Sequence, residues 1–324
     1  MGKLNIKNTD IEKFIDIAHK IGVEDAKQVK ELFDKVKFTT LNIYDYLPDL
    51  VMMTRSFVSQ EDFMIERQFA DTSEPCLLLS FNNVFDDGLH SSETDDFHII
   101  EEIPHIRIGP LNVFDQLTIE KSIHKKQLLV LITYRYLKEF LNDEEEPFLH
   151  LLDQENLFWI EEIMSEDIIR VIHEITSEKE IALAQFYFKL KALELVYFLF
   201  RDLSKRKDNN HKNLTANEIV TIYNVRDFLV KQLDKPATIA DLLKIASMNE
   251  LKLRKIFTQV FGMGIYDYYQ QIRMKEAARL LKEESLNVSE VGFKLGFTNL
   301  SHFGKVFEEH IGMKPKKFAM SESN

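Results

Sequence analysis

Hydrophobic residues change their spacing twice along the chain, and these changes divide it into three parts. From residue 10 to 36, apolar side chains recur every three or four positions with a break at Gly22, which predicts one or two short helices. From 38 to 136, short apolar runs alternate with turn-rich pieces such as "FDDGLHSSETDD", which predicts a small β-barrel or sandwich. From 155 to 203 the helical spacing returns. The pattern therefore predicts an α+β fold with a β-rich core.

The segment "IALAQFYFKLKALELVYFLF" (181–200) is apolar on nearly every side of a helix. Such a helix must be covered by its own domain or by a second subunit, and we favour a homodimer through the helices of 155–203. The polar stretch "SKRKDNNHKNLT" that follows has the composition of a domain boundary. We therefore expect a first domain over 1–205 and a linker over 206–215.

Beyond the linker, every segment with clear periodicity is helical, and one layout occurs twice. Thr238 is placed to cap a helix and Gly262 to end the next one, which predicts a helix-turn-helix over 238–259. Lys255 and Phe257 return as Lys305 and Phe307, fifty residues on, which predicts a second unit over 287–310. Upstream residues match at an offset of forty-nine, so the second turn is expected to be one residue longer.

A run of strong helix formers, "GIYDYYQQIRMKEAARLLKEES", lies between the two units. About 20 helical residues span roughly 30 Å. This length is close to one turn of B-DNA, about 34 Å, so the run could place two helices in successive major grooves.

The distribution of charge supports a nucleic-acid partner for the second half only. The whole chain of 324 residues has a net charge of −12. From Thr215 onward it has 16 Lys and Arg against 13 Asp and Glu, a net charge of +3, and the preceding part has −15. Because attraction to phosphate acts over roughly 8–10 Å, the charge of the contacting domain matters more than the total.

The segment "VSEVGFKLGFTNLSHFGKVFEEHIGMKPKKF" (288–318) resembles the second helix-turn-helix of the AraC/XylS transcriptional regulators, and "RMKEAARLL" resembles their connecting helix. The resemblance covers 216–321. It implies a seven-helix double helix-turn-helix domain behind a cupin-like sensor domain. The function that it implies is a ligand-responsive, sequence-specific activator, with promoter DNA, RNA polymerase and a small-molecule effector as partners. The pieces "NELKLRKIFTQVFG" and "KLKALELVYFLF" are also similar to the siderophore-sensing, pyochelin-regulator-like branch.

Helix geometry and the family pattern together select the residues expected to contact DNA. In the first unit, Leu253, Ile256, Phe257 and Val260 form the stripe expected to be buried. The resemblance implies base contacts from the exposed positions, namely Leu251, Arg254 and Lys255 in the first unit and Ser301, His302 and Lys305 in the second. Gly304 offers no side chain, so we expect weaker base specificity from the second unit. We expect Glu250, which would repel phosphate, to point away.

Contacts to the DNA backbone are expected from helix starts and from a basic cluster. Thr238 and Ser289, at two predicted helix starts, could present backbone N–H groups to phosphate. Lys314, Lys316 and Lys317 form a cluster that predicts a backbone clamp, with a solvated chain end as the alternative.

The sequence predicts neither an enzyme nor a metal or other cofactor. Cys76 lies in the apolar run "CLLLSF", where a raised pKa is more expected than the reactive thiolate that alkyl transfer would need. The chain also lacks the His-x-His spacing of cupin metal sites; its four candidate histidines are His90, His98, His105 and His124.

Two interpretations of the first domain stay open. One is an effector pocket lined by apolar residues of 77–81 and 128–132, which could equally be plain core. The other is a constitutive DNA-binding regulator whose first domain is only a structural or partner-binding module. Without an apolar run of about 18 residues or a signal peptide, we expect a bacterial cytoplasmic protein at the nucleoid that does not contact the membrane.

Overall fold

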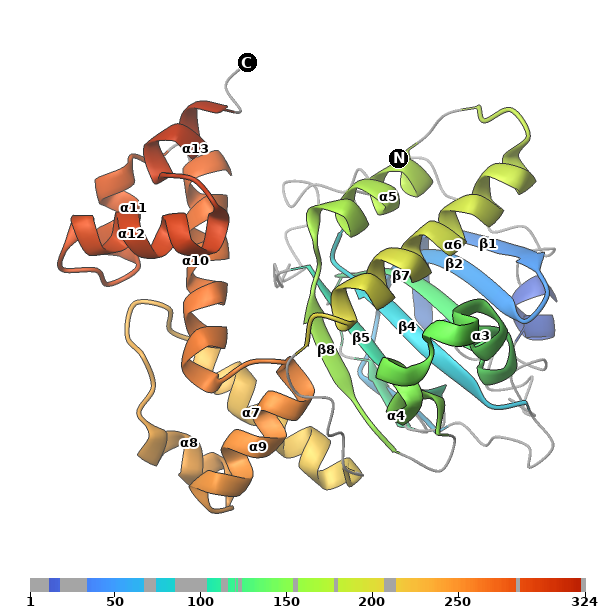
Figure 1. Ribbon diagram of the computed structural model, residues 1–324, viewed down its shortest axis with the longest axis horizontal. Coiled ribbons are helices and arrows are strands. Elements are labelled where there is room, and N and C mark those ends of the chain that lie inside the picture. Colours follow the sequence, from blue (N-terminus) through green and yellow to red (C-terminus); the bar gives the residue numbers. More distant parts are fainter. Residues whose placement is uncertain are drawn as a thin grey trace. The chain divides into compact units, whose positions relative to one another are not determined.

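The computed structural model divides the chain into two compact units, residues 1–213 (unit 1) and 214–324 (unit 2) (Figure 1). The residues described are 12–17, 34–66, 74–84, 104–111, 116–119, 121, 124–153, 157–177, 180–206, 214–283 and 286–321. Within the predicted N-terminal helical segment, residues 12–17 are helical and the remainder up to residue 33 lies outside the described residues.

Unit 1 is built on a six-stranded antiparallel sheet with the order β1-β2-β7-β4-β5-β8. Its strands are β1 (Val36–Leu47), β2 (Leu50–Ser59), β4 (Cys76–Asn82), β5 (His105–Pro110), β7 (His124–Thr133) and β8 (Ile160–Ile163). Two further strands, β3 (Phe63–Glu66) and β6 (Gln116–Ile119), pair with each other. The predicted sheet domain with helices is confirmed, and its cupin-like character stays a prediction.

The two faces of the sheet contribute to two different cores because side chains alternate along each strand. On β4, Leu77, Leu79 and Phe81 join the larger core, whereas Leu78 joins the smaller one on the opposite face. The central strand β7 divides its residues in the same way. The residues predicted to line an effector pocket, 77–81 and 128–132, are therefore all buried and are shared between these two cores.

Four helices cover one face of the sheet, as Figure 1 shows. They are α3 (Tyr134–Leu141), α4 (Leu149–Leu152), α5 (Glu166–Thr176) and α6 (Ala184–Leu203). In α5, Ile168, Val171, Ile172 and Ile175 are buried, which is the i, i+3, i+4, i+7 pattern of an amphipathic helix.

Two predicted boundaries in unit 1 are wrong. The stretch 155–203 is not helical throughout, because β8 forms the edge of the sheet, and its Glu161 carboxylate lies 3.2 Å from Nε of Arg107 on β5. The β-type run up to residue 136 ends early, because the Thr133 hydroxyl accepts the Tyr136 N–H and starts α3 at Tyr134. Both features depend on contacts that periodicity does not show.

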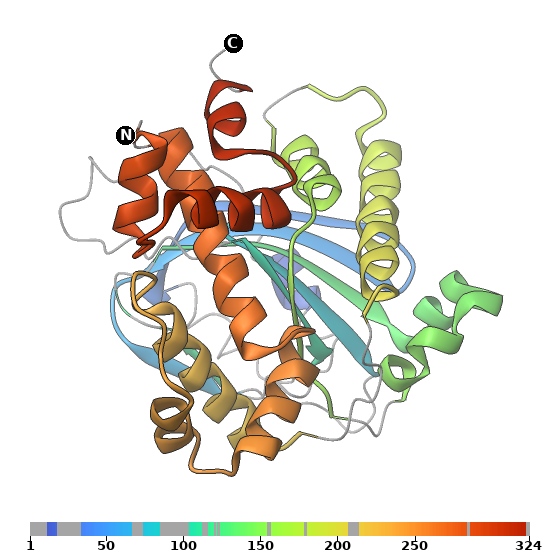
Figure 2. The ribbon, with the colours of Figure 1, turned by 60° about the vertical axis from the view of Figure 1, so that its left-hand side comes forward.

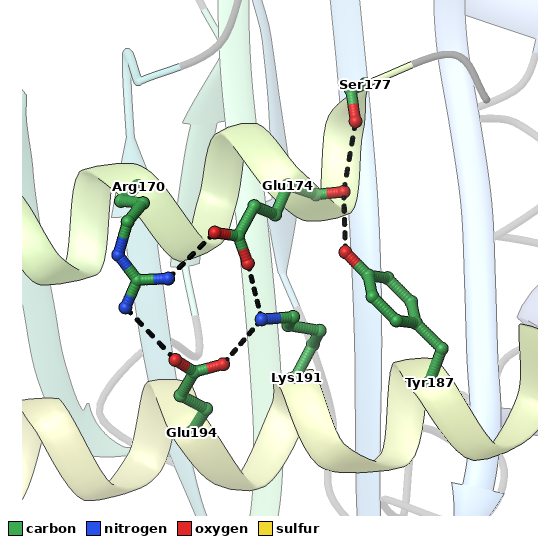
Figure 3. Close-up of polar contacts among 6 residues, drawn as sticks. All are labelled: Arg170, Glu174, Ser177, Tyr187, Lys191 and Glu194. Carbon is green, nitrogen blue, oxygen red and sulfur yellow. Dashed lines mark hydrogen bonds and ion pairs between the residues drawn. The ribbon is translucent and has the colours of Figure 1, made fainter. Parts of the chain in front are cut away.

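Helices α5 and α6 are joined by four charged side chains of alternating sign, which Figure 3 shows. Arg170 lies 2.7 Å from Glu174 and 3.1 Å from Glu194, and Lys191 contacts Glu174 and lies 2.7 Å from Glu194. The hydrogen bond from Lys191 is the main cause that lowers the pKa of Glu174. The pKa of Glu194 is also lowered, because hydrogen bonds from Lys191 and Arg170 together outweigh its burial.

The described residues of unit 2 form seven helices. They are α7 (Ala216–Val230), α8 (Ile239–Ala246), α9 (Glu250–Phe261), α10 (Ile265–Glu283), α11 (Val288–Lys294), α12 (Leu300–Ile311) and α13 (Pro315–Ser321). The long helix α10 runs between the group α7–α9 and the group α11–α13 (Figure 2). Across both units, no helix in the described ranges has the length and apolar character needed to cross a membrane.

Candidate nucleic-acid interface

The first helix-turn-helix consists of α8 and α9, and its ends are fixed by local hydrogen bonds. The Thr238 hydroxyl accepts the Asp241 N–H at 3.2 Å and caps α8, as predicted. Asn249 caps α9 by accepting the Lys252 N–H at 2.9 Å. Gly262, with a φ of +71°, ends α9 in the left-handed conformation, as predicted.

The second helix-turn-helix consists of α11 and α12, which begin 49 and 50 residues after their counterparts. The second unit is one residue longer from helix start to helix start, but the turn itself, 295–299 against 247–249, is two residues longer and not one as predicted, because α11 is one residue shorter than α8. Gly296 makes this turn possible: its φ is +77°, and a Cβ atom there would lie 2.0 Å from the carbonyl oxygen of Asp234.

Helix α11 starts at Val288, one residue before the predicted start at Ser289. Asn287 is the N-cap of α11, and its side-chain oxygen accepts the N–H groups of Ser289 and Glu290, each at 3.0 Å. The backbone N–H of Ser289 is thus already bonded within the protein. Only the exposed hydroxyl of Ser289 is left for a phosphate.

An acidic side chain lies in the first turn of α8 and of α11, the first helices of the two helix-turn-helix units. In α8, the Thr238 hydroxyl donates to Asp241 at 2.6 Å, and this bond is the main cause that lowers the pKa of Asp241. In α11, Glu290 accepts the Asn287 N–H at 2.8 Å. Because these carboxylates occupy the position that suits an anion, both helix starts are poorer phosphate sites than the sequence predicts.

In each unit the second helix is the one predicted to contact base edges, and we call it the reading helix. The reading helix of the first unit, α9, has one buried and one exposed face. The predicted stripe of Leu253, Ile256, Phe257 and Val260 is buried, which confirms that prediction. The side chains predicted to face DNA are exposed, and Leu251 is 81% exposed. These three side chains, Leu251, Arg254 and Lys255, thus lie together on one helix.

Glu250 forms an ion pair with Arg254, a contact that was not predicted, and its orientation away from DNA stays a prediction. Its Oε1 atom lies 2.7 Å from both Nε and Nη2 of Arg254, one turn further along α9. A Glu four residues before an Arg favours this pairing. The i, i+4 spacing was visible in the sequence and would have indicated the contact.

The reading helix of the second unit, α12, exposes Ser301, His302 and Lys305 as predicted. The Asn299 side chain accepts the N–H groups of Ser301 and His302 at 2.9 and 3.1 Å, which fixes the start of the helix. A Cβ atom on Gly304 would have no neighbour within 4 Å, so the exposed face is flat at this position. Lys305 lies 3.9 Å from Glu309.

The basic cluster near the C-terminal end lies on and just before α13. Lys314, Lys316 and Lys317 are all exposed. The helix is held by Phe318, whose ring centroid lies 5.6 Å from that of Phe307 in α12. Lys316 and Lys317 therefore belong to a packed helix, which Lys314 directly precedes, and not to a loose chain end.

Arg273 of α10 joins the second turn to the connecting helix. It is only 6% exposed, its Nε donates to the carbonyl oxygen of Leu295 at 2.9 Å, and its guanidinium lies 3.7 Å from the centroid of the Phe297 ring. Burial lowers its pKa. Tyr269, one turn earlier, donates to the carbonyl oxygen of Leu233 at 2.9 Å. Sequence reasoning missed this role, because a single Arg in a helix of mixed charge gives no sign of burial.

Those residues considered for catalysis or metal binding that the structure describes do not come together. Burial is the main cause that raises the pKa of Cys76 to about 12, and its thiol donates to the carbonyl oxygen of Glu74. His105 is buried on β5, His124 lies 2.7 Å from Ser56 Oγ, and His90 and His98 lie outside the described residues. Within the described ranges, no group of three or more His, Cys, Asp or Glu side chains could hold a metal ion.

Comparison with known proteins gives matches that concentrate on unit 2. A family model described as a helix-turn-helix domain matches residues 242–321. The regulatory protein PchR of Pseudomonas aeruginosa is 35% identical over 103 residues, 32% of this chain and 35% of that protein. The transcriptional activator RhaR of Mannheimia succiniciproducens is 20% identical over 274 residues, 81% of this chain and 93% of that protein.

Other matches are shorter or more distant. The Msm operon regulatory protein of Streptococcus mutans is 25% identical over 150 residues, 46% of this chain. The chain thus spans about a third of PchR and about half of the Msm regulator. Among solved structures, the DNA-binding domain of AdpA in complex with a target DNA is 20% identical with a TM-score of 0.30, covering 31% of this chain and 91% of that one.

The family model begins inside α8 and ends at the last residue of α13, so it includes both reading helices and the helix that connects them. Residues 242–321 therefore match a helix-turn-helix domain, and this part of the chain is similar to AraC-type transcriptional regulators.

Proposed function

We propose that the protein is a transcriptional activator that binds promoter DNA through α9 and α12. The observation that carries this function is the pair of reading helices, each with one buried face and one exposed face that holds a cation, Arg254 or Lys305. The helix that separates them, α10, has 19 residues and a length of roughly 28 Å. This length is near one turn of B-DNA, about 34 Å, so both helices can reach the same side of the duplex.

Each exposed side chain has a chemical role in this proposal. Arg254 can donate two hydrogen bonds to the O6 and N7 atoms of guanine, and Leu251 can contact a thymine methyl group. Lys255, Ser301, His302 and Lys305 supply further contacts to base edges. The backbone contacts come chiefly from Lys314, Lys316 and Lys317, with lesser ones from Thr238 and Ser289.

Arg254→Ala and Lys305→Ala in the full chain test the reading helices. The DNA probes are duplexes that the wild-type protein selects from a randomised library, measured at physiological salt beside an unselected duplex. Loss of a bidentate guanine contact, about 1–3 kcal/mol, should weaken Arg254→Ala binding to selected DNA by about 5- to 150-fold. Lys282→Ala, an exposed position on α10, is the control and should bind as the wild type does. If both variants bind selected DNA like the wild type, the assignment of contacts is wrong.

We propose further that unit 1 senses a small molecule, such as a siderophore or another metabolite. Support comes from a polar row on the sheet face opposite the helices, which crosses β2, β7, β4 and β5 in register. Arg55 donates to Gln127 at 2.7 Å, Gln127 to Asn82 at 2.9 Å, and Asn82 to the carbonyl oxygen of His105 at 3.4 Å. Asn82 and His105 are buried. Buried polar groups that hydrogen-bond to one another can exchange these bonds for hydrogen bonds to a polar effector.

The alternative, a constitutive regulator whose unit 1 is only structural, predicts a different result in one measurement. Thermal unfolding of the full chain is followed with a panel of siderophores, sugars and organic acids. An effector that couples to DNA binding by about 1–3 kcal/mol must bind the folded protein and raise its unfolding temperature. If no member of a wide panel raises it, the alternative is favoured.

We also propose that α6 forms a homodimer contact. Leu183, just before the helix, and Phe186, Leu190 and Tyr197 within it are exposed. Their spacing of three, four and seven residues places them along one side of the helix. Pairing of this stripe with its copy would bring four reading helices to one promoter and raise their effective concentration.

A further inference from the structure

Glu250 is an anionic residue on the face of α9 that we propose meets DNA. It is the first residue of the helix, directly after the cap Asn249. The side chains of Glu250 and Arg254 are each 50% exposed, so neither is held in place by the core. Their positions are set by one another, through two distances of 2.7 Å to the same carboxylate oxygen.

The contact uses one particular edge of the Arg254 guanidinium. A guanidinium group has two edges that can bind a pair of acceptors, the side edge of Nε and Nη2 and the end edge of Nη1 and Nη2. Glu250 takes the side edge. Because the group is planar, fixing the side edge also fixes the direction of the end edge. The end edge is then the one that can bind guanine O6 and N7 together.

The carboxylate has a second effect through its charge. A phosphate that approached the side edge of Arg254 would meet Glu250, and two anions at this distance repel each other. Arg254 is thereby discouraged from binding the DNA backbone, which carries no sequence information. An acidic residue here lowers the affinity for every duplex but lowers it most for duplexes that Arg254 would contact only through phosphate.

We infer that Glu250 is a positioning residue that determines base specificity, by aiming Arg254 at a guanine and by excluding phosphate from it. The inference rests on the proposed function of α9. The second reading helix lacks an equivalent arrangement among its described residues: Lys305 has no planar fork, and Glu309 lies 3.9 Å from it and one turn after it.

The test compares full-length wild-type protein with Glu250→Gln, which keeps the size and hydrogen-bonding capacity of the side chain and removes its charge. Each protein selects sequences from the same randomised duplex library, and binding to one unselected duplex is then measured over a range of salt concentrations. We expect the preference for guanine at the position read by Arg254 to fall at least fivefold in Glu250→Gln. Binding to the unselected duplex should strengthen, with a salt slope steeper by about 0.9, the value for one added phosphate contact.

Two controls separate this role from a general one. Glu309→Gln removes the corresponding charge from α12 and should leave the guanine preference unchanged. In an Arg254→Ala background, Glu250→Gln should have no further effect on base preference, because Glu250 acts through Arg254.

The outcomes are distinct. An unchanged guanine preference and salt slope in Glu250→Gln would overturn the inference, as would a variant that no longer binds any duplex. If the wild-type protein itself selects no sequence from the library, the proposed function of the reading helices fails first.

Discussion

Single residues in the second helix-turn-helix show how closely the backbone of unit 2 is packed. Gly296 and Gly304 are only eight positions apart, yet their surroundings are opposite. At Gly296 the backbone is left-handed and a Cβ atom would overlap the carbonyl group of Asp234. At Gly304, in the middle of α12, a Cβ atom would meet open space.

Alanine at these two glycines should therefore change stability in opposite directions. Gly296→Ala should destabilise unit 2 by about 3 kcal/mol, because strain at positive φ adds to the overlap with Asp234. Gly304→Ala should stabilise it by about 0.5–1 kcal/mol, because Ala loses less chain entropy than Gly in a helix. Thermal unfolding of both variants checks this, and each serves as control for the other. Equal shifts of the same sign would contradict the packing at Gly296.

At this scale, the sequence predicted packing better than polar contacts. The stripe from Leu253 to Val260 follows from helical period alone, and so does the exposure of Arg254. The position of the α11 cap does not, because Asn287 and Ser289 are both good capping residues. The choice is made by Glu290, which lies three residues after Asn287 and forms a capping box with it.

Helices and strands depend more than single residues on partners that are distant in the sequence. The four-residue strand β8 is too short to show a period, and only its pairing with β5 identifies it. Helix α6 was predicted to be helical but not to be charged on one flank. Its contact with α5 arises because Lys191 and Glu194 meet Arg170 and Glu174 across the helix pair.

The α5–α6 ion pairs should make unit 1 less stable in acid. The folded-state pKa values of Glu174 and Glu194 are lowered, so these groups contribute stability above about pH 4.5, their ordinary value, and lose it as the pH falls through the lowered values. Lys191→Met should remove much of this dependence, and because the pairs are partly exposed it should cost only about 0.5–1 kcal/mol at pH 7.

Denaturant unfolding of the wild type and of Lys191→Met between pH 3 and pH 7 measures this effect. This range extends about one to two pH units beyond the ordinary pKa values of carboxyl groups on either side. Lys189→Met on the same helix is the control and should keep the wild-type dependence. Parallel pH profiles for the wild type and Lys191→Met would contradict the assignment.

The whole molecule combines an acidic unit 1 with a mildly basic unit 2. The charges of about −15 and +3 were visible in the sequence, and so was the boundary composition between the units. The exposed stripe of α6 was only partly visible, because a helix that is apolar on all sides does not show which side its own domain covers. The structure assigns Leu195, Val196 and Leu199 to the core, which leaves Leu190 and Tyr197 outside.

A charge placed in this stripe should separate the proposed dimer. Leu190→Asp should shift the sedimentation coefficient of the full chain from that of a dimer to that of a monomer, because an unpaired charge would be buried in the contact. The control is Leu149→Asp, at another exposed apolar position of unit 1, which should leave the association unchanged. The contact would be contradicted if the wild-type protein sediments as a monomer at about 100 μM, which is roughly ten to a hundred times the Kd of a weak dimer.

The bonds from Arg273 and Tyr269 also decide which piece of this protein could be exchanged as a module. The turn of the second reading unit lies against Arg273 of α10 and against the backbone of Asp234, which precedes α8. If α11 and α12 alone were transferred to another protein, the turn between them would lose its contacts with Arg273 and with the backbone of Asp234. Because α8 and α9 also pack against α7, where the Tyr223 ring centroid lies 5.8 Å from that of Phe261, the smallest piece that could be exchanged begins with α7 and includes the whole of α10. The two reading units would then be transferred together.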